Sequence, residues 1–137
     1  MVQVMKYRPV NAWILPYLRQ GLAEHFDMDV WVSDHWPEET TPAPKSWVAV
    51  RDDGCTGRHM AAQDRMITIT VSGRTQTSTD ELCESVAALI RAMPHADHLP
   101  VCAVAEPSGG YAVEDKDWPY LKVLSIDITQ VGKVISL

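Results

Sequence analysis

The stretch "MITITVSGRTQTSTDELCESVAALIRAM", Met66 to Met93, joins an alternating strand to an amphipathic helix through one short polar turn. Its first part places Ile67, Ile69 and Val71 on one face and hydroxyl side chains on the other, the period of a half-buried strand. Its second part repeats apolar residues at three- and four-residue spacing, up to Pro94. The expected buried stripe of this helix comprises Leu82, Val86, Leu89, Ile90 and Met93.

The turn inside this stretch could bind phosphate or could be a capped corner. A Walker loop needs a second glycine followed by lysine, whereas "SGRTQTSTDE" has one glycine and no lysine. Ser78 stands three residues before Glu81, which predicts a capping box with Ser78 as the N-cap. Asp80 and Glu81 would then lie in the first turn and repel an anion. The sequence therefore favours a structural corner.

Composition describes an ordinary folded protein. The 137 residues suit one domain, 1–137, and 46% hydrophobic with 22% charged residues is close to the globular average. A net charge of -6 argues against broad adhesion to nucleic acid phosphates or to anionic lipid. No run approaches the length of a membrane span, and the N-terminus lacks the pattern of a secretory signal. We expect no membrane association and a location in the cytoplasm.

The remaining segments predict one more helix and several strands. Asn11 could cap a helix with Leu15, Leu18, Leu22 and Phe26 as its stripe, although Pro16 would distort its first turn or delay its start. Strands are expected at residues 29–33, 47–50, 101–106, 111–115 and 120–131, with an irregular loop at 51–65 and a turn at residues 109–110. The order predicts an α+β fold, a mainly antiparallel β-sheet with two principal α-helices packed on one face.

The last strand carries apolar residues on both faces. Leu124, Ile126 and Ile128 share one face, while Leu121 and Val123 share the other. We expect either a bulge or a second buried surface.

Candidate chemical groups are sparse. His95 and His98 flank Asp97 and could ligate a metal, but prolines bracket the segment and solvated loop residues are the simpler interpretation. Cys55 and His59 are a second, weak candidate for a metal pair. With Asp64 they could also form a nucleophilic catalytic set. Ser108 in "PSGG" is a further candidate nucleophile, but it lacks the sequence of a nucleophile elbow. Cys83 and Cys102 are expected to fill the core. We expect no enzyme and no cofactor.

Exposed aromatic and basic residues are the remaining candidates. Trp36 and Trp118 lie in proline-containing segments and could be contact anchors or lids over the sheet. Four arginines surround the loop between Val50 and Thr75 and could pair with a neighbouring subunit or stay hydrated. These are Arg51, Arg58, Arg65 and Arg74.

The order of these segments resembles the tail terminator, or tail-completion, proteins of long-tailed bacteriophages. The matching features are the helix "VNAWILPYLRQGL", the strand and turn "WVAVRDDG", the unit "RMITITVSGRTQTSTDELCESVAALIRAM" and the closing hairpin "GGYAVEDKDWPYLKVLSIDITQVG". The likeness extends from about Asn11 to Gly132, and its most specific part is Met66 to Met93.

The resemblance implies a structural virion protein without catalysis. Copies would form a six-membered ring in the phage tail, assembled in the host cytoplasm, that ends tail-tube polymerisation and meets the head-completion, or stopper, protein. An acidic channel would let DNA pass without specific binding. The segment Asp52 to Asp64, including His59 and Met60, would be a contact or lumen element together with its flanking arginines, and Trp118 is the second choice. One alternative is a small α+β metal- or ligand-binding domain or enzyme that uses Cys55/His59 or His95/His98. Another is a bacterial toxin-antitoxin or regulatory partner domain.

Overall fold

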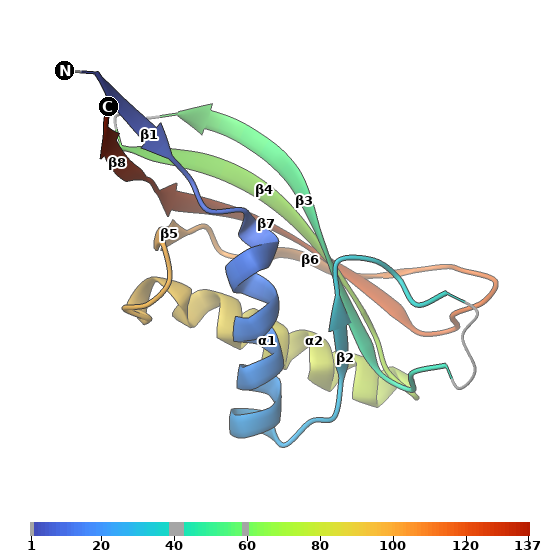
Figure 1. Ribbon diagram of the computed structural model, residues 1–137. Coiled ribbons are helices and arrows are strands. Elements are labelled where there is room, and N and C mark those ends of the chain that lie inside the picture. Colours follow the sequence, from blue (N-terminus) through green and yellow to red (C-terminus); the bar gives the residue numbers. More distant parts are fainter. Residues whose placement is uncertain (1, 39–42, 59–60) are drawn as a thin grey trace.

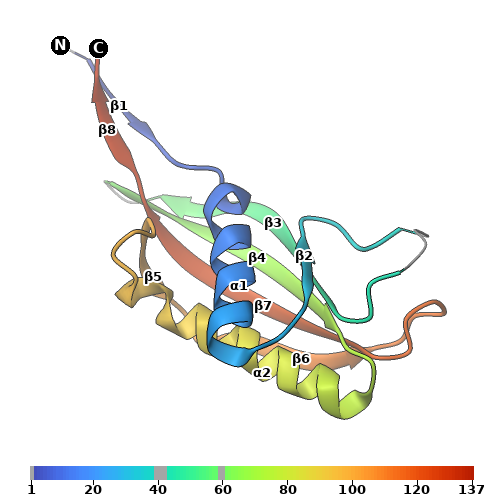
Figure 2. The same cartoon turned by 60° about the horizontal axis from the view of Figure 1, so that its bottom comes forward.

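The computed structural model describes residues 2–38, 43–58 and 61–137. Two helices cover one face of a six-stranded sheet, and a two-stranded ribbon formed by the two ends of the chain projects beyond them (Figure 1; Figure 2). The helices are α1 (Val10–Phe26), α2 (Gln76–Ala92) and the short 3-10 helix η1 (Met93–His95). The strands are β1 (Gln3–Lys6), β2 (Trp31–Ser33), β3 (Trp47–Arg58), β4 (Ala62–Ser72), β5 (Val101–Val104), β6 (Ser108–Val113), β7 (Leu121–Val131) and β8 (Lys133–Ser136).

The main sheet has the order β2-β3-β4-β7, and both β5 and β6 pair with the free side of β7. Strand β2 runs parallel to β3, and every other neighbouring pair in the sheet is antiparallel. The α+β class predicted from the sequence, with a mainly antiparallel sheet and both principal helices on one face, is confirmed (Figure 2).

The core lies between the helices and this sheet. Ile67, Ile69 and Val71 of β4 are fully buried, as their alternation predicted. The five residues of the predicted α2 stripe are buried against them, which confirms that stripe. This strand and helix therefore form the centre of the apolar layer.

The corner between β4 and α2 is capped, but by a different residue from the one predicted. The N-cap is Thr75: the Ser78 amide donates to Thr75 Oγ1 at 3.0 Å, and the Thr75 amide donates to Ser78 Oγ at 2.9 Å. Ser78 is thus the third helical residue, where its hydroxyl performs the return bond that a glutamate usually makes. Asp80 and Glu81 lie in the second turn, because the helix begins at Gln76.

Gly73 lets the chain pass close to the start of α2. A Cβ on Gly73 would lie 2.7 Å from Ser78 Oγ and 2.8 Å from the Thr79 amide nitrogen. The Gly73 amide donates to Thr79 Oγ1 at 3.0 Å. The amides of Gly73, Thr75 and Ser78 therefore bond to side chains of the corner itself, as expected of a capped corner rather than an open anion loop.

Helix α1 differs from its prediction in start and in buried face. It begins at Val10 after Pro9, Asn11 does not cap it, and Pro16 is accommodated on the exposed side. The buried residues are Val10, Trp13, Ile14, Leu18, Gly21 and Leu22. Phe26, placed in the stripe by the sequence, is 38% exposed.

Gly21 lies on the buried face of α1, where this helix meets α2. A Cβ there would lie 2.5 Å from Leu89 Cδ2, so the glycine marks the place where α1 and α2 approach each other. The sequence indicated only that glycine weakens a helix by about 1 kcal/mol relative to alanine. Its role in the helix crossing becomes visible only when both helices are placed.

Removing the hydroxyl of Tyr17 should test the second link between the helices. Tyr17 donates its hydroxyl proton to the Leu89 carbonyl, and burial raises the pKa of the Tyr17 phenol. Tyr17→Phe should lower the free energy of unfolding by about 1 kcal/mol, because the carbonyl loses a partly buried donor. Chemical denaturation followed by circular dichroism measures this, and an unchanged midpoint would contradict the bond.

The predicted loop at residues 51–65 is a β-hairpin. Strand β3 continues to Arg58 and β4 begins at Ala62, with register shifts between Asp52 and Gly54 and between Cys55 and Gly57. Gly54 has a φ of 104°, which a side chain would strain. These bulges break the alternation of period two, which is why the sequence looked irregular.

The predicted turn at Gly109–Gly110 is also part of a strand. Both glycines have positive φ inside β6, at a register shift between Gly109 and Tyr111. The chain reverses instead between β6 and β7, over residues 114–120. The glycine pair predicts a turn, but in the structure it supplies the backbone of a bulge.

The helix-free face of the sheet carries a second, smaller core. Trp47, Ala49 and Leu121 are buried there, with Val113 and Trp118 packed against them. The second buried surface inferred from β7 is confirmed at Leu121, and the bulges fall in its partners β5 and β6.

Candidate functional site

The described cysteines and histidines form no metal centre. Residues 2–38, 43–58 and 61–137 contain no group of three or more His, Cys, Asp or Glu placed to hold a metal ion. His95 and His98 are both exposed, and Cys55 donates its thiol proton to the Gly57 carbonyl. His59, its suggested partner, and Met60 lie outside the described residues.

Cys83 is buried as predicted, and burial raises the pKa of its thiol. Cys102 is exposed, so its prediction as a core residue is wrong. It lies in β5 at the register shift between Val101 and Ala103, which interrupts the strict alternation on which the prediction depended.

Ser33, Asp34 and His35 form the nearest approach to a catalytic set, and the sequence reasoning did not select them. Ser33 Oγ lies 2.9 Å and Asp34 Oδ1 lies 2.7 Å from the same atom, His35 Nδ1. A serine-histidine-aspartate relay needs the two ring nitrogens to face different partners. This arrangement is a local network, in which the hydrogen bond with His35 lowers the pKa of Asp34.

The four candidate arginines do not gather at one surface. Arg51 bonds to Asp53 at 2.6 Å, and Arg65 bonds to Asp52 at 2.7 Å. Arg58 is exposed at the far end of β3, whereas Arg74 is exposed in the corner before α2. Burial opposes ionisation of Asp53, but the bonds from Thr68 and Arg51 outweigh it and lower its pKa.

The bond between Arg65 and Asp52 predicts that Arg65→Glu destabilises the fold of a single subunit. Both side chains are only about a quarter exposed (21% and 26%), so the variant places two carboxylates together inside one subunit. The cost should lie between the ~1 kcal/mol of an exposed pair and the ~3 kcal/mol of a buried one. Arg58→Glu is the matched control and should change unfolding by about 0.5 kcal/mol or less. Equal unfolding midpoints for the two variants, measured in urea, would contradict this.

Trp36 and Trp118 are lids over the helix-free face. Their rings pack on buried Trp47, with centroid distances of 5.3 Å for Trp36 and 5.2 Å for Trp118. Trp36 remains 40% exposed, and Trp118 is half-buried. Both therefore fix their loops to the sheet, and part of the Trp36 ring is left for solvent or a partner.

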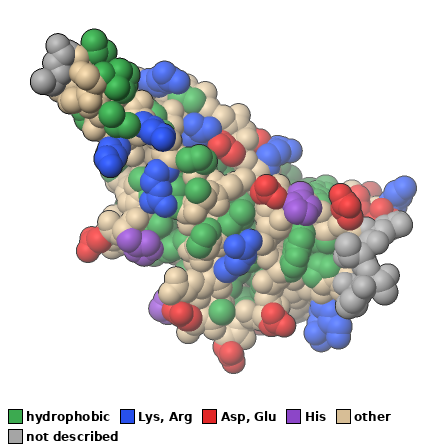
Figure 3. All heavy atoms as spheres, in the orientation of Figure 1, with side chains coloured by type: hydrophobic (Ala, Val, Ile, Leu, Met, Phe, Trp, Pro, Cys, Tyr) green, Lys and Arg blue, Asp and Glu red, His purple; other side chains and the backbone are tan. Residues whose placement is uncertain are grey.

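The ribbon of β1 and β8 was not anticipated from the sequence. Gln3 pairs with Ser136 and Lys6 with Lys133, which brings the two ends of the chain together. Val2, Val4, Val134 and Leu137 are 61%, 40%, 50% and 75% exposed. Figure 3 shows hydrophobic side chains over the ribbon and Lys or Arg side chains near its base. The strands are short and their pairing joins residues from opposite ends of the chain, so no local pattern indicated them.

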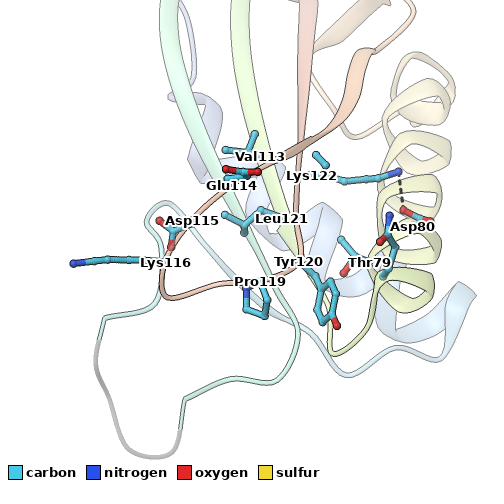
Figure 4. A pocket seen from close by; sticks show the side chains of 12 residues that line it. Thr79, Asp80, Val113, Glu114, Asp115, Lys116, Pro119, Tyr120, Leu121 and Lys122 are labelled. Atoms are coloured by element: carbon cyan, nitrogen blue, oxygen red, sulfur yellow. Dashed lines mark ion pairs between the residues drawn. The ribbon is translucent and has the colours of Figure 1, made fainter.

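A hollow of about 630 Å³ lies at the other end, between the start of α2 and the β6–β7 connection (Figure 4). Its walls include Val113, Pro119, Tyr120 and Leu121, and Glu114 and Asp115 line it as well. Lys122 crosses to Asp80 of α2, with 2.7 Å between Nζ and Oδ1. This bond ties the sheet to the helix beneath the hollow.

No helix within the described ranges has both the length and the apolar character needed to cross a membrane. No protein-family model matches the sequence, and no curated protein matches it either.

Proposed function

We propose that this chain is a tail terminator of a long-tailed bacteriophage. Copies close into a ring, of six subunits by the resemblance, on the head-proximal end of the tail tube. The ring stops tube polymerisation and presents its other face to the head-completion protein. The proposal joins the resemblance in the order of segments to one observation, the ribbon that projects from the folded body (Figure 1).

The ribbon supports assembly for a physical reason. A two-stranded sheet is marginally stable alone in water, and this one pairs only four residues with four. Its apolar side chains are exposed, an arrangement that favours burial against a partner. A subunit of this shape is better suited to an oligomeric assembly than to a monomer.

The charge of the chain suits a ring through which DNA passes. With 18 acidic against 12 basic residues, the subunit repels phosphate overall. Arg51 and Arg65 add little attraction, since each is paired to a carboxylate of the same strand pair. This supports a passage without specific contacts to DNA.

The test adds the purified chain to the polymerising tail-tube protein of its phage. We expect tubes of limited length with an added ring at one end in negative-stain images. Glu84→Gln, at an exposed position of α2, serves as a matched control and should cap tubes as the parent does. Tubes that lengthen as they do without the chain would overturn the proposal.

Metal analysis separates this function from the metal-site alternative. The purified chain should carry no stoichiometric transition metal. A bound metal that is lost in His98→Ala would favour the alternative instead.

A further inference from the structure

One face of the ribbon is apolar at its tip and basic at its base. Residues directly opposite in an antiparallel pair share a face, so Val4 lies beside Ile135 and Lys6 lies beside Lys133. Side chains two residues apart also share a face, which adds Val2 and Leu137 to this one. The tip residues Val2 and Leu137 are the most exposed large hydrophobic side chains among the described residues.

Among the described residues, the two lysines at the base of the ribbon lack a partner of opposite charge. Like charges directly opposite each other in a strand pair are destabilising. Neither Lys6 nor Lys133 has an ion-pair partner within residues 2–38, 43–58 and 61–137. A carboxylate supplied from outside the subunit would relieve this repulsion.

The hollow beside α2 is apolar and acidic, which complements the apolar and basic face of the ribbon. Its exposed apolar lining is Ala112, Pro119 and Tyr120, and the carboxylates of Glu114 and Asp115 lie along the same hollow (Figure 4). The acidic side chains of this connection exceed the basic ones, because Lys116 is its only cation between Glu114 and Asp117. Lys122 is already held by Asp80, so it does not cancel Glu114.

The ribbon and the hollow lie at opposite ends of the subunit. Both ribbon views place β1 and β8 at one end and the β6–β7 connection at the other (Figure 1; Figure 2). Within one rigid subunit they cannot meet, but between copies they are two different patches. A contact between unlike patches, repeated with a closing rotation, generates a ring.

We propose that the β1–β8 ribbon of one subunit docks in the hollow between α2 and the β6–β7 connection of the next copy. Val2, Val4 and Leu137 cover the apolar walls, while Lys6 and Lys133 face Glu114 and Asp115. This contact rests on the proposed ring and identifies the surfaces that form it. The partner is a second copy of this chain, since the chain itself supplies both halves of a complementary pair.

A disulfide cross-link tests the contact directly. The parent is the full chain with the exposed Cys55 and Cys102 replaced by serine, and its native mass is measured first. Val4→Cys and Ala112→Cys are then introduced together, because Val4 is on the ribbon and Ala112 lines the hollow. Mild oxidation should convert the double variant into a ladder of linked subunits, and neither single variant should give the ladder.

The outcomes distinguish the inference from the proposed function. If the parent and the double variant both form a ring but the double variant gives no ladder, the docking is overturned and the proposed ring is not. A parent that stays monomeric overturns both. A cross-link only to added tube protein would assign the ribbon to a different partner and overturn the docking.

A charge exchange gives a second test that does not depend on cysteine. Lys133→Glu and Glu114→Lys should each raise the concentration at which the ring dissociates by about tenfold, and together they should restore it. Lys45→Glu, at an exposed lysine outside both patches, is the matched control. Equal dissociation of the single variants and the control, with circular dichroism unchanged, would contradict the proposed contact.

Discussion

Replacing Trp47 by alanine should lower the free energy of unfolding by about 3–5 kcal/mol, the usual cost of removing a large buried aromatic ring. Trp47 is fully buried and lies between the rings of Trp36 and Trp118. Its loss removes the centre of the core on the helix-free face and releases both loops. Urea unfolding followed by circular dichroism measures the change.

Two variants control for other causes of this loss. Trp36→Ala removes a ring that is 40% exposed and should cost clearly less than Trp47→Ala. Trp47→Phe keeps an aromatic ring in the same place and should recover part of the stability. If Trp36→Ala proved as costly as Trp47→Ala, the exposed ring rather than the buried one would be the anchor.

The second large effect is expected at the corner that begins α2. Gly73→Ala places a Cβ 2.8 Å from the Thr79 amide nitrogen, a backbone atom that cannot move without shifting the helix. Such overpacking costs about 1–3 kcal/mol, and a disturbed N-cap adds about 1 kcal/mol. Thermal and urea unfolding should both show the loss.

Gly57→Ala is the matched control for this substitution. Gly57 lies in β3, and among the described residues an added Cβ would approach Asp64 Oδ2, a side-chain atom, at 3.3 Å. We expect a change within about 0.5 kcal/mol, as for most surface substitutions. Equal losses for Gly73→Ala and Gly57→Ala would show that glycine at the corner is not needed for close approach.

The sequence predicted the elements whose residues repeat without interruption. Ile67, Ile69 and Val71 follow a strict alternation, and the α2 stripe follows a helical one, so both were located correctly. The hairpin of β3 and β4 was missed because its two bulges and Gly54 interrupt the alternation. The predicted N-cap of α2 was displaced by three residues, from Thr75 to Ser78, since both residues favour this position and only geometry chooses between them.

The candidate site was harder to predict, because it depends on tertiary neighbours. Trp36 and Trp118 were selected from the sequence, but only the structure shows that both pack on Trp47. The sequence likewise left Arg65 open for pairing with a neighbouring subunit, whereas in the structure it is bonded to Asp52 of the same subunit. The β1–β8 ribbon had no local signal, since its pairing is made by residues from opposite ends of the chain.

The native mass of the purified full chain tests the central claim most directly. If subunits join end to end and the rotation closes, native mass spectrometry should give one discrete oligomer, six times 15.3 kDa by the resemblance. A chain that stays at the mass of a single subunit at high concentration would contradict the account.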